Sequence, residues 1–275
     1  MQLKSKIKNI ANKKNIRPQL VMQVYMLERL LKRISVSKYK DNFILKGGFL
    51  ISSMLGLQTR TTKDLDTTLK GLKLTDKSIT EVFHDICMID CNDNIHFELN
   101  TIEEIRIQDN YPGLRAKFIA IFETLKVSLY VDITTGDRIT PKEIEFEIPS
   151  MFEDEVLNVQ AYNIETLLAE KLETILSRVT ANTRLRDFYD VFILVKLRKN
   201  TINLETLKSA LTKTAQKRDT TKFVENYQKI LIEIFLDERM CAFWERYRKE
   251  FHYAEGITFA EVKDTLTDLL NALHK

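Results

Sequence analysis

The sequence is poor in the residues that break or cross-link a chain. Its 275 residues include seven glycines, four prolines and three cysteines. So few turn-forming residues predict long elements, mainly helices. The cysteines, Cys87, Cys91 and Cys241, are odd in number and lack a CxxC spacing. They predict neither a disulfide framework nor a zinc site and favour a reducing compartment.

Long apolar runs are also missing. No segment approaches the roughly 20 apolar residues that cross a bilayer. The basic first 18 residues lack the apolar stretch of a signal peptide. We therefore expect a cytoplasmic protein without a membrane partner. The net charge of +3 suits a nucleic-acid partner only if the basic residues cluster on one face.

The hydrophobic pattern divides the chain into two parts. Before about residue 155, helical spacing over 18–37 and 75–89 alternates with strand patterns. Afterwards only helical spacing remains. The pattern predicts an α+β fold with two domains: residues 1–155 with a mixed β-sheet flanked by helices, and residues 156–275 with helices alone. The expected strands are 42–46, 63–70, 95–107, 114–124, 125–137 and 143–149, and the later helices are 164–179, 184–199, 203–217, 221–235, 237–250 and 258–273.

Two short patterns suggest chemistry in the first domain. Gly47 and Gly48 lie between an expected strand and an expected helix, where backbone N–H groups can bind an anion. Asp64 and Asp66 alternate with apolar residues, so both carboxylates lie on the solvent side of one strand. Asp132 lies on the polar side of another strand, and three adjacent carboxylates would suit Mg²⁺. Either pattern alone is more often a simple turn or a solvated strand.

The helical part contributes a second group of charged residues. Lys171 lies within an apolar helix, and Arg178 follows two turns later on a similar face. The next helix begins with Asp187 and Asp190, which are neighbours on its surface. The simpler alternatives are a lysine that reaches to solvent from an interface and ordinary negative charge at a helix N-terminus.

In this order the segments resemble the AbiEii/AbiGii toxin family of nucleotidyltransferases, which includes the MenT toxins. The likeness rests on "LKGGFLISSMLGLQTRTTKDLD", "VDITTGDRITP", "LLAEKLETILSR" and "TRLRDFYDVFIL", within about residues 43–197. Thr62 stands where the family usually has serine. Gly48 stands where many nucleotidyltransferases have serine.

The resemblance implies a metal-dependent nucleotidyltransferase toxin of a bacterial toxin–antitoxin or abortive phage-infection system. A nucleoside triphosphate is then the substrate, and the helical domain completes the active site. Asp64, Asp66 and Asp132 would hold Mg²⁺ or Mn²⁺. Asp187 or Asp190, with Asp187 preferred, would hold Lys171 or take part in catalysis. The nucleotide-binding residues would be Gly47, Gly48, Arg60, Thr62, Lys171 and Arg178.

The resemblance also implies a cognate antitoxin and, from some members, tRNA as the acceptor. Arg246, Arg248 and Lys249 interleave with Trp244, Tyr247 and Tyr253, a pattern that can follow phosphates and stack bases. Ordinary polar helix faces are the alternative. Two other functions stay open: an antibiotic nucleotidyltransferase with a small-molecule acceptor, and a nucleotide-binding interaction module without turnover.

Overall fold

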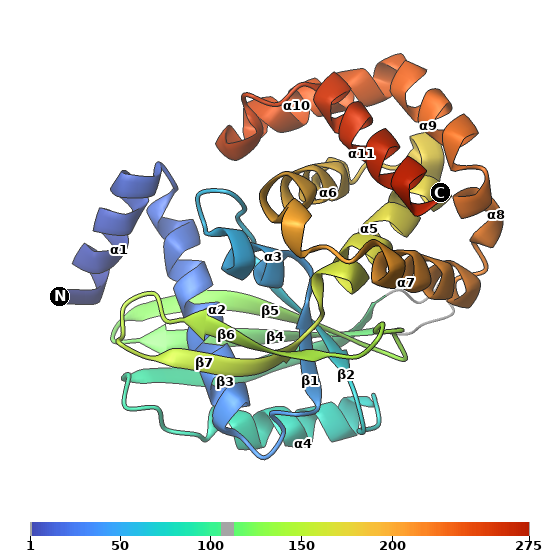
Figure 1. The fold of residues 1–275 in the computed structure, drawn as a ribbon. Helices are drawn as coiled ribbons and strands as arrows, with labels where there is room; N and C mark the ends of the chain where they lie inside the picture. The colour runs from blue at the N-terminus through green and yellow to red at the C-terminus, as the bar shows by residue number, and fades with distance from the viewer. Residues whose placement is uncertain (1, 106–112, 275) are drawn as a thin grey trace. The chain divides into compact units, whose positions relative to one another are not determined.

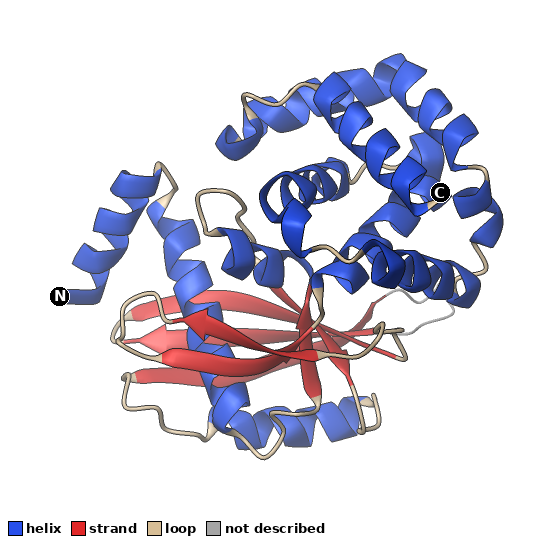
Figure 2. Cartoon of the chain, viewed as in Figure 1, coloured by secondary structure: helices blue, strands red, loops and turns tan. Residues whose placement is uncertain are grey.

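The computed structural model describes residues 2–105 and 113–274. The chain forms two compact units (Figure 1). The residues up to Asp137, together with Glu143–Tyr162, make up what we call the sheet unit. Arg138–Lys142 and the residues from Asn163 onward make up the helical unit. Strands occur in the first and helices alone fill the described part of the second (Figure 2), which confirms the expected α+β fold.

The sheet unit contains a mixed seven-stranded sheet in the order β3-β4-β5-β2-β1-β7-β6. β2 runs parallel to β5 and antiparallel to β1, while β1 runs parallel to β7. The remaining neighbours are antiparallel. The strands are β1 (Phe43–Lys46), β2 (Asp64–Leu69), β3 (Ile95–Ile105), β4 (Gly113–Phe122), β5 (Leu125–Thr135), β6 (Ile144–Pro149) and β7 (Val156–Ala161).

Most of these strands follow from the sequence pattern. The expected strands at 114–124 and 125–137 form the antiparallel pair β4 and β5, and the strand expected at 143–149 is β6, at the edge of the sheet. Residues 106–107, expected at the end of β3, lie outside the described residues. β7 is not expected from the sequence, because its six residues directly precede a strongly helical segment.

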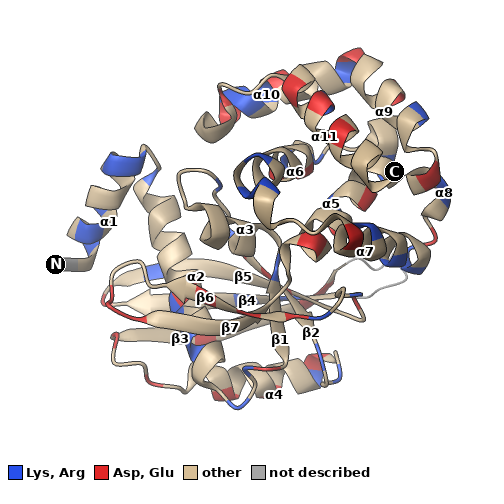
Figure 3. Cartoon of the chain, in the orientation of Figure 1, with Lys and Arg blue, Asp and Glu red and all other residues tan. Residues whose placement is uncertain are grey.

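Four helices of the sheet unit are described: α1 (Gln2–Lys14), α2 (Pro18–Val36), α3 (Gly47–Leu55) and α4 (Asp76–Cys87). α4 packs on the apolar sheet face, where Phe83 contacts the rings of Phe43 and Phe118. α2 lies on the same face, since Arg33 stacks over Phe97. α3 begins on the opposite face, beside the side chain of Asp66. α1 packs on α2, and its charged side chains are all basic (Figure 3).

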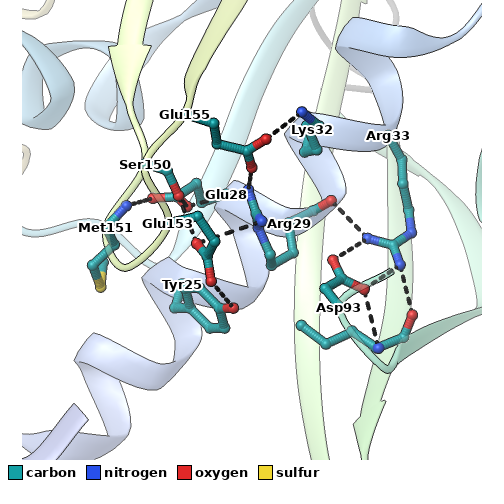
Figure 4. Close-up of polar contacts among 11 residues, drawn as sticks. Tyr25, Glu28, Arg29, Lys32, Arg33, Asp93, Ser150, Met151, Glu153 and Glu155 are labelled. Atoms are coloured by element: carbon teal, nitrogen blue, oxygen red, sulfur yellow. Dashed lines mark hydrogen bonds and ion pairs between the residues drawn. The ribbon is translucent and has the colours of Figure 1, made fainter. Parts of the chain in front are cut away.

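A buried polar network ties α2 to the connection between β6 and β7 (Figure 4). Arg29 Nη2 donates to Glu155 Oε1 at 2.7 Å. The Glu28 carboxylate accepts hydrogen bonds from Ser150 Oγ at 2.7 Å and from the Met151 N–H at 2.9 Å. Burial raises the pKa of Glu28 to about 7, although these hydrogen bonds and Arg29 oppose the rise. The connection is therefore held firmly against α2.

Several helices of the helical unit have a side-chain cap at their N-terminus. The expected capping box is present: Thr258 Oγ1 accepts from the Glu261 N–H, and Glu261 Oε2 accepts from the Thr258 N–H. The single helix expected at 221–235 is wrong, because Asn226 separates two helices there. The long helices are α5 (Ile164–Arg178), α6 (Leu185–Arg198), α7 (Leu204–Lys217), α9 (Tyr227–Leu236), α10 (Glu238–Glu250) and α11 (Phe259–Leu273), with the short α8 (Thr221–Glu225) before α9.

Candidate functional site

The two aspartates of β2 lie on the sheet face that α3 adjoins. Leu65 between them is fully buried on the opposite face, while Asp64 and Asp66 are half-buried. β2 is the direct neighbour of β5, and Asp66 pairs in register with Asp132. The three expected carboxylates thus lie on one face of two adjacent strands, as period-two patterning requires.

The glycine pair lies directly against Asp66. Gly47 has a φ of +65°, and a Cβ added to it would lie 2.1 Å from Asp66 Oδ2. The Gly48 N–H donates to the same oxygen at 3.3 Å. The N-terminus of α3 therefore faces a carboxylate, and only glycine fits at position 47 without displacing it.

The side chains of Arg60 and Thr62 lie next to Gly48 in this turn. A Cβ on Gly48 would lie 3.0 Å from Thr62 Oγ1 and 3.1 Å from Arg60 Nη2. Arg60 is only 4% exposed, and its guanidinium donates to the Thr61 carbonyl. Thr62 Oγ1 donates to the Asp64 carbonyl at 3.2 Å. Both residues lie in the segment that directly precedes β2. Their contact with a nucleotide stays a prediction.

Four charged residues form one row across the centre of the sheet. Lys46 pairs with Asp66, Asp66 with Asp132, and Asp132 with Arg115, on β1, β2, β5 and β4. The Arg115 fork binds both Asp132 oxygens, with Nε 2.6 Å from Oδ1 and Nη2 2.7 Å from Oδ2. This bidentate bond raises the pKa of the Arg115 guanidinium, and the charges of Asp132, Asp64 and Asp66 raise it further.

The metal-binding role expected for the three carboxylates stays a prediction. Within residues 2–105 and 113–274, no group of three or more His, Cys, Asp and Glu side chains is gathered closely enough to hold a metal ion. Asp64 and Asp66 supply oxygen ligands of the kind that hold Mg²⁺ together with substrate phosphates. Asp132 has both of its oxygens engaged by Arg115, which competes with a metal for them.

A second charged group beside the site was not foreseen from the sequence. The buried carboxylate of Asp137 accepts from Lys46 Nζ at 2.5 Å, Thr68 Oγ1 at 2.5 Å and Thr134 Oγ1 at 2.6 Å. Burial alone would raise the pKa of Asp137, but the Lys46 charge and these hydrogen bonds hold it well below its usual range. Gly136, at a φ of +76°, turns the chain so that Asp137 points back into the sheet.

Both Asp137 and Lys46 lie in segments that the sequence already singles out. Asp137 is the last residue of the "DITTGD" segment, and Lys46 directly precedes the glycine pair. A lysine within a four-residue buried strand needs a buried partner of opposite charge. The strand order that identifies this partner cannot be read from either segment alone.

In the helical unit, Lys171 is held by both candidate aspartates. Lys171 Nζ lies 2.5 Å from Asp187 Oδ1 and 3.0 Å from Asp190 Oδ2. The Asp190 side chain is fully buried, and Lys171 is only 16% exposed. Asp187 Oδ2 is buried and has no hydrogen-bond partner within the described part of the chain. Arg178 is exposed at the end of α5.

The aromatic residues expected to stack bases belong to the core of the helical unit. Trp244 is fully buried and its Nε1 donates to the Ile257 carbonyl at 3.0 Å. Tyr247 is buried beside it, and the ring of Tyr253 is half-buried against Tyr189. The expected stacking surface is therefore wrong for Trp244 and Tyr247, because the aromatic spacing reflects the buried side of α10.

The basic residues of α10 remain accessible. Arg246 and Lys249 are exposed, and Arg248 is half-exposed beside Glu245, with Arg248 Nη1 3.1 Å from Glu245 Oε1. An RNA contact at these residues stays a prediction without aromatic support.

The mixed sheet, with a Gly-Gly turn against an Asp-x-Asp strand, agrees with the nucleotidyltransferase fold that the sequence resemblance implies. Two crystal structures from Helicobacter pylori share this fold. One is of a candidate nucleotidyltransferase, with 18% identity over 94% of this chain and 96% of that chain and a TM-score of 0.52. The other is JHP933, with 17% identity over 93% and 92% and a TM-score of 0.52.

The sequence itself identifies the family. Residues 29–266 match the family described as "Nucleotidyl transferase AbiEii toxin, Type IV TA system", and the chain belongs to this family. Among curated proteins no relative matches significantly. Within the described residues, no helix has both the length and the apolarity needed to cross a membrane.

Proposed function

We propose that this protein is a metal-dependent nucleotidyltransferase toxin that transfers a nucleotide from a nucleoside triphosphate to an acceptor hydroxyl. Family membership supports the nucleotidyl transfer. The observation that carries the proposal is the contact of the Gly47–Gly48 turn with Asp66 on the strand that also presents Asp64. The contact supports the proposal because it lies between a helix N-terminus that would bind phosphate and carboxylates that would hold a metal.

In the sheet unit, Asp64 and Asp66 would hold Mg²⁺ or Mn²⁺. The bound metal would neutralise charge on the phosphates and the departing pyrophosphate. The Gly47–Gly48 turn would bind phosphate oxygens through its N–H groups. Asp132, once released by Arg115, would accept the proton of the acceptor hydroxyl. The hydroxyl oxygen would bond to the α-phosphorus while the bond from the α-phosphorus to pyrophosphate breaks.

In the helical unit, Lys171 would bind the triphosphate. Asp187 and Asp190 fix the position of its ammonium group, as the two short contacts indicate. Arg178 would add a further positive charge for the nucleotide. Most of the rate acceleration would then come from positioning and charge neutralisation.

For the acceptor we propose tRNA, and for the partner a cognate antitoxin, in the bacterial cytoplasm and in defence against phage. The family is a toxin–antitoxin family, which supports the partner. An antibiotic nucleotidyltransferase is the second candidate. A nucleotide-binding module without turnover is disfavoured, because it would have no use for a lysine held by two aspartates or for the paired carboxylates of β2.

The test is incubation with each of the four α-labelled nucleoside triphosphates, Mg²⁺ and either total bacterial RNA or a mixture of aminoglycosides. We expect label in RNA, and none when Asp64→Asn replaces the wild type. Label on an aminoglycoside would support the antibiotic enzyme instead. No label on either acceptor, with nucleotide binding retained, would support the module without turnover.

A further inference from the structure

The positive charge of the chain is concentrated at its start. Residues 1–27 contain six basic residues and no acidic one, and Glu28 is the first acid. The other 248 residues contain 36 basic and 39 acidic residues, so they are negative overall. The basic residues of this segment are Lys4, Lys6, Lys8, Lys13, Lys14 and Arg17.

Five of the six lie on α1, which has one apolar and one basic side. Leu3, Ile7 and Ala11 are buried, and α1 packs through this stripe on α2. The lysines flank the stripe, and Lys4, Lys6, Lys8 and Lys13 are exposed. In Figure 3 the ribbon of α1 carries the blue of Lys and Arg and no red of Asp and Glu, in agreement with its sequence.

The protein does not neutralise most of this charge. Within the residues that the structure describes, Lys4, Lys8, Lys13 and Arg17 make no ion pair. Lys6 lies over the ring of Phe152, 5.5 Å from its centroid, which leaves its charge in place. Unpaired lysines at regular spacing attract a polyanion, and the attraction depends strongly on salt.

α1 is also joined by a hydrogen bond to the segment that leads into β2, the strand that carries the two aspartates. Lys14 Nζ, at the end of α1, donates to Gln58 Oε1 at 2.8 Å, and Gln23 Nε2, on the following helix α2, donates to the Lys63 carbonyl at 3.1 Å. Residues 56–63 lead directly into Asp64. A polyanion on α1 would therefore be held in the same unit as the candidate metal site, close to where β2 begins.

The basic residues of α10 offer a weaker surface. α10 contains three acidic residues beside its four basic ones, and Arg248 is paired with Glu245. α1 contains five lysines and no acid. α1 also lies outside residues 29–266, which match the family.

We propose that α1 binds the phosphate backbone of an RNA, which would be the acceptor of the reaction. The proposal rests on the proposed function for the role of the RNA, but not for its binding. RNA is the occupant that the charges favour, since a phosphate backbone presents closely and regularly spaced negative charge to the row of exposed lysines. An acidic protein is the competing occupant.

The test uses the full chain and a fluorescently labelled pool of bulk bacterial tRNA, without nucleotide or Mg²⁺. Lys4, Lys8 and Lys13 are all replaced by glutamine, which keeps helix propensity. We expect RNA affinity to fall about tenfold at 100 mM KCl, and the slope of log Kd against log [KCl] to fall by about 2. The matched control replaces Lys40, Lys73 and Lys77, three exposed lysines of the same unit, by glutamine and should bind as the wild type does.

Three outcomes would overturn the proposal: wild-type affinity in the α1 variant, an equal loss in the control, or no RNA binding by the wild type. In the first case an acidic protein becomes the occupant to examine. Nucleotide transfer is measured separately. RNA binding through α1 without transfer would refute only the proposed function, while transfer with an α1-independent RNA affinity would refute only this inference.

Discussion

Gly47 and Asp66 are packed so closely that no side chain fits between them. A Cβ on Gly47 would lie 2.1 Å from Asp66 Oδ2 and 2.7 Å from its Cβ. The two residues are 19 positions apart, and antiparallel pairing of β1 with β2 brings them together. The glycine pair and the Asp-x-Asp pattern are therefore a single structural feature, because each limits what the other can be.

This contact predicts the effect of Gly47→Ala. The added methyl group displaces the carboxylate, and alanine is strained at a φ of +65°. We expect a loss of roughly 2–4 kcal/mol in stability and loss of the thermal stabilisation that Mg²⁺ with nucleoside triphosphate gives the wild type.

Gly71→Ala is the matched control. Gly71 also has a positive φ, of +76°, but its added Cβ meets only Asn42 Nδ2, at 3.3 Å. This variant should lose some stability through strain and keep the stabilisation by nucleotide. A Gly47→Ala protein that is stabilised by nucleotide as strongly as the wild type would contradict the proposed role of the turn.

The bond between Arg115 and Asp132 predicts a change in metal affinity. Removing the guanidinium in Arg115→Ala frees both Asp132 oxygens, so Mn²⁺ should bind up to about fivefold tighter, as expected for loss of a partly exposed ion pair. Electron paramagnetic resonance of Mn²⁺ without nucleotide measures this affinity. In an Asp132→Asn background the gain should disappear, and a gain that persists there would show that Arg115 acts through another group.

The buried pair of Lys46 and Asp137 predicts a pH-dependent stability. Asp137→Asn leaves the Lys46 ammonium buried without its counter-charge, which costs roughly 3 kcal/mol at pH 7. Since the folded-state pKa of Asp137 is lowered, its contribution is complete above about pH 4, the range of an unfolded aspartate, and is lost as the pH falls further.

Denaturant unfolding of the wild type and Asp137→Asn between pH 3 and pH 8 measures this contribution. The stability difference should be constant from pH 5 to 8 and narrow below pH 4. Asp85→Asn, which breaks an exposed pair with Lys38, should change stability little at any pH. An Asp137→Asn effect as small as that of Asp85→Asn would refute the pairing.

Lys171→Arg separates charge from geometry in the helical unit. Arginine keeps a positive charge between Asp187 and Asp190, so we expect the variant to fold within about 1–2 kcal/mol of the wild type. Its planar group cannot replace the compact ammonium, so nucleotide transfer should fall at least about a hundredfold. Wild-type transfer by this variant would remove Lys171 from the catalytic machinery.

The sequence predicts those parts of the site that depend on local pattern. Alternation with Leu65 is sufficient to place Asp64 and Asp66 on one face, because side chains on a strand alternate strictly. The partner of Lys46 depends on strand order, which brings together Lys46 and Asp137, 91 residues apart. Such pairing is not encoded in any short stretch.

Burial on helices was harder to predict. Trp244, Tyr247 and Arg248 follow one another at helical spacing along α10. The spacing alone does not say which side of α10 faces the core. The structure buries the aromatic side, which is the usual outcome for large apolar residues. The sequence pattern does not predict the helix α1, because its apolar stripe has only three buried residues among five lysines.

The central claim, nucleotidyl transfer at Asp64 and Asp66, is tested most directly by the position of the label. The same nucleoside triphosphate, labelled at either the α- or the γ-phosphate, is incubated with Mg²⁺ and total RNA. We predict that the α-label enters RNA, that the γ-label leaves as pyrophosphate, and that Asp66→Asn abolishes both. Incorporation of the γ-label, or undiminished incorporation by Asp66→Asn, would contradict the claim.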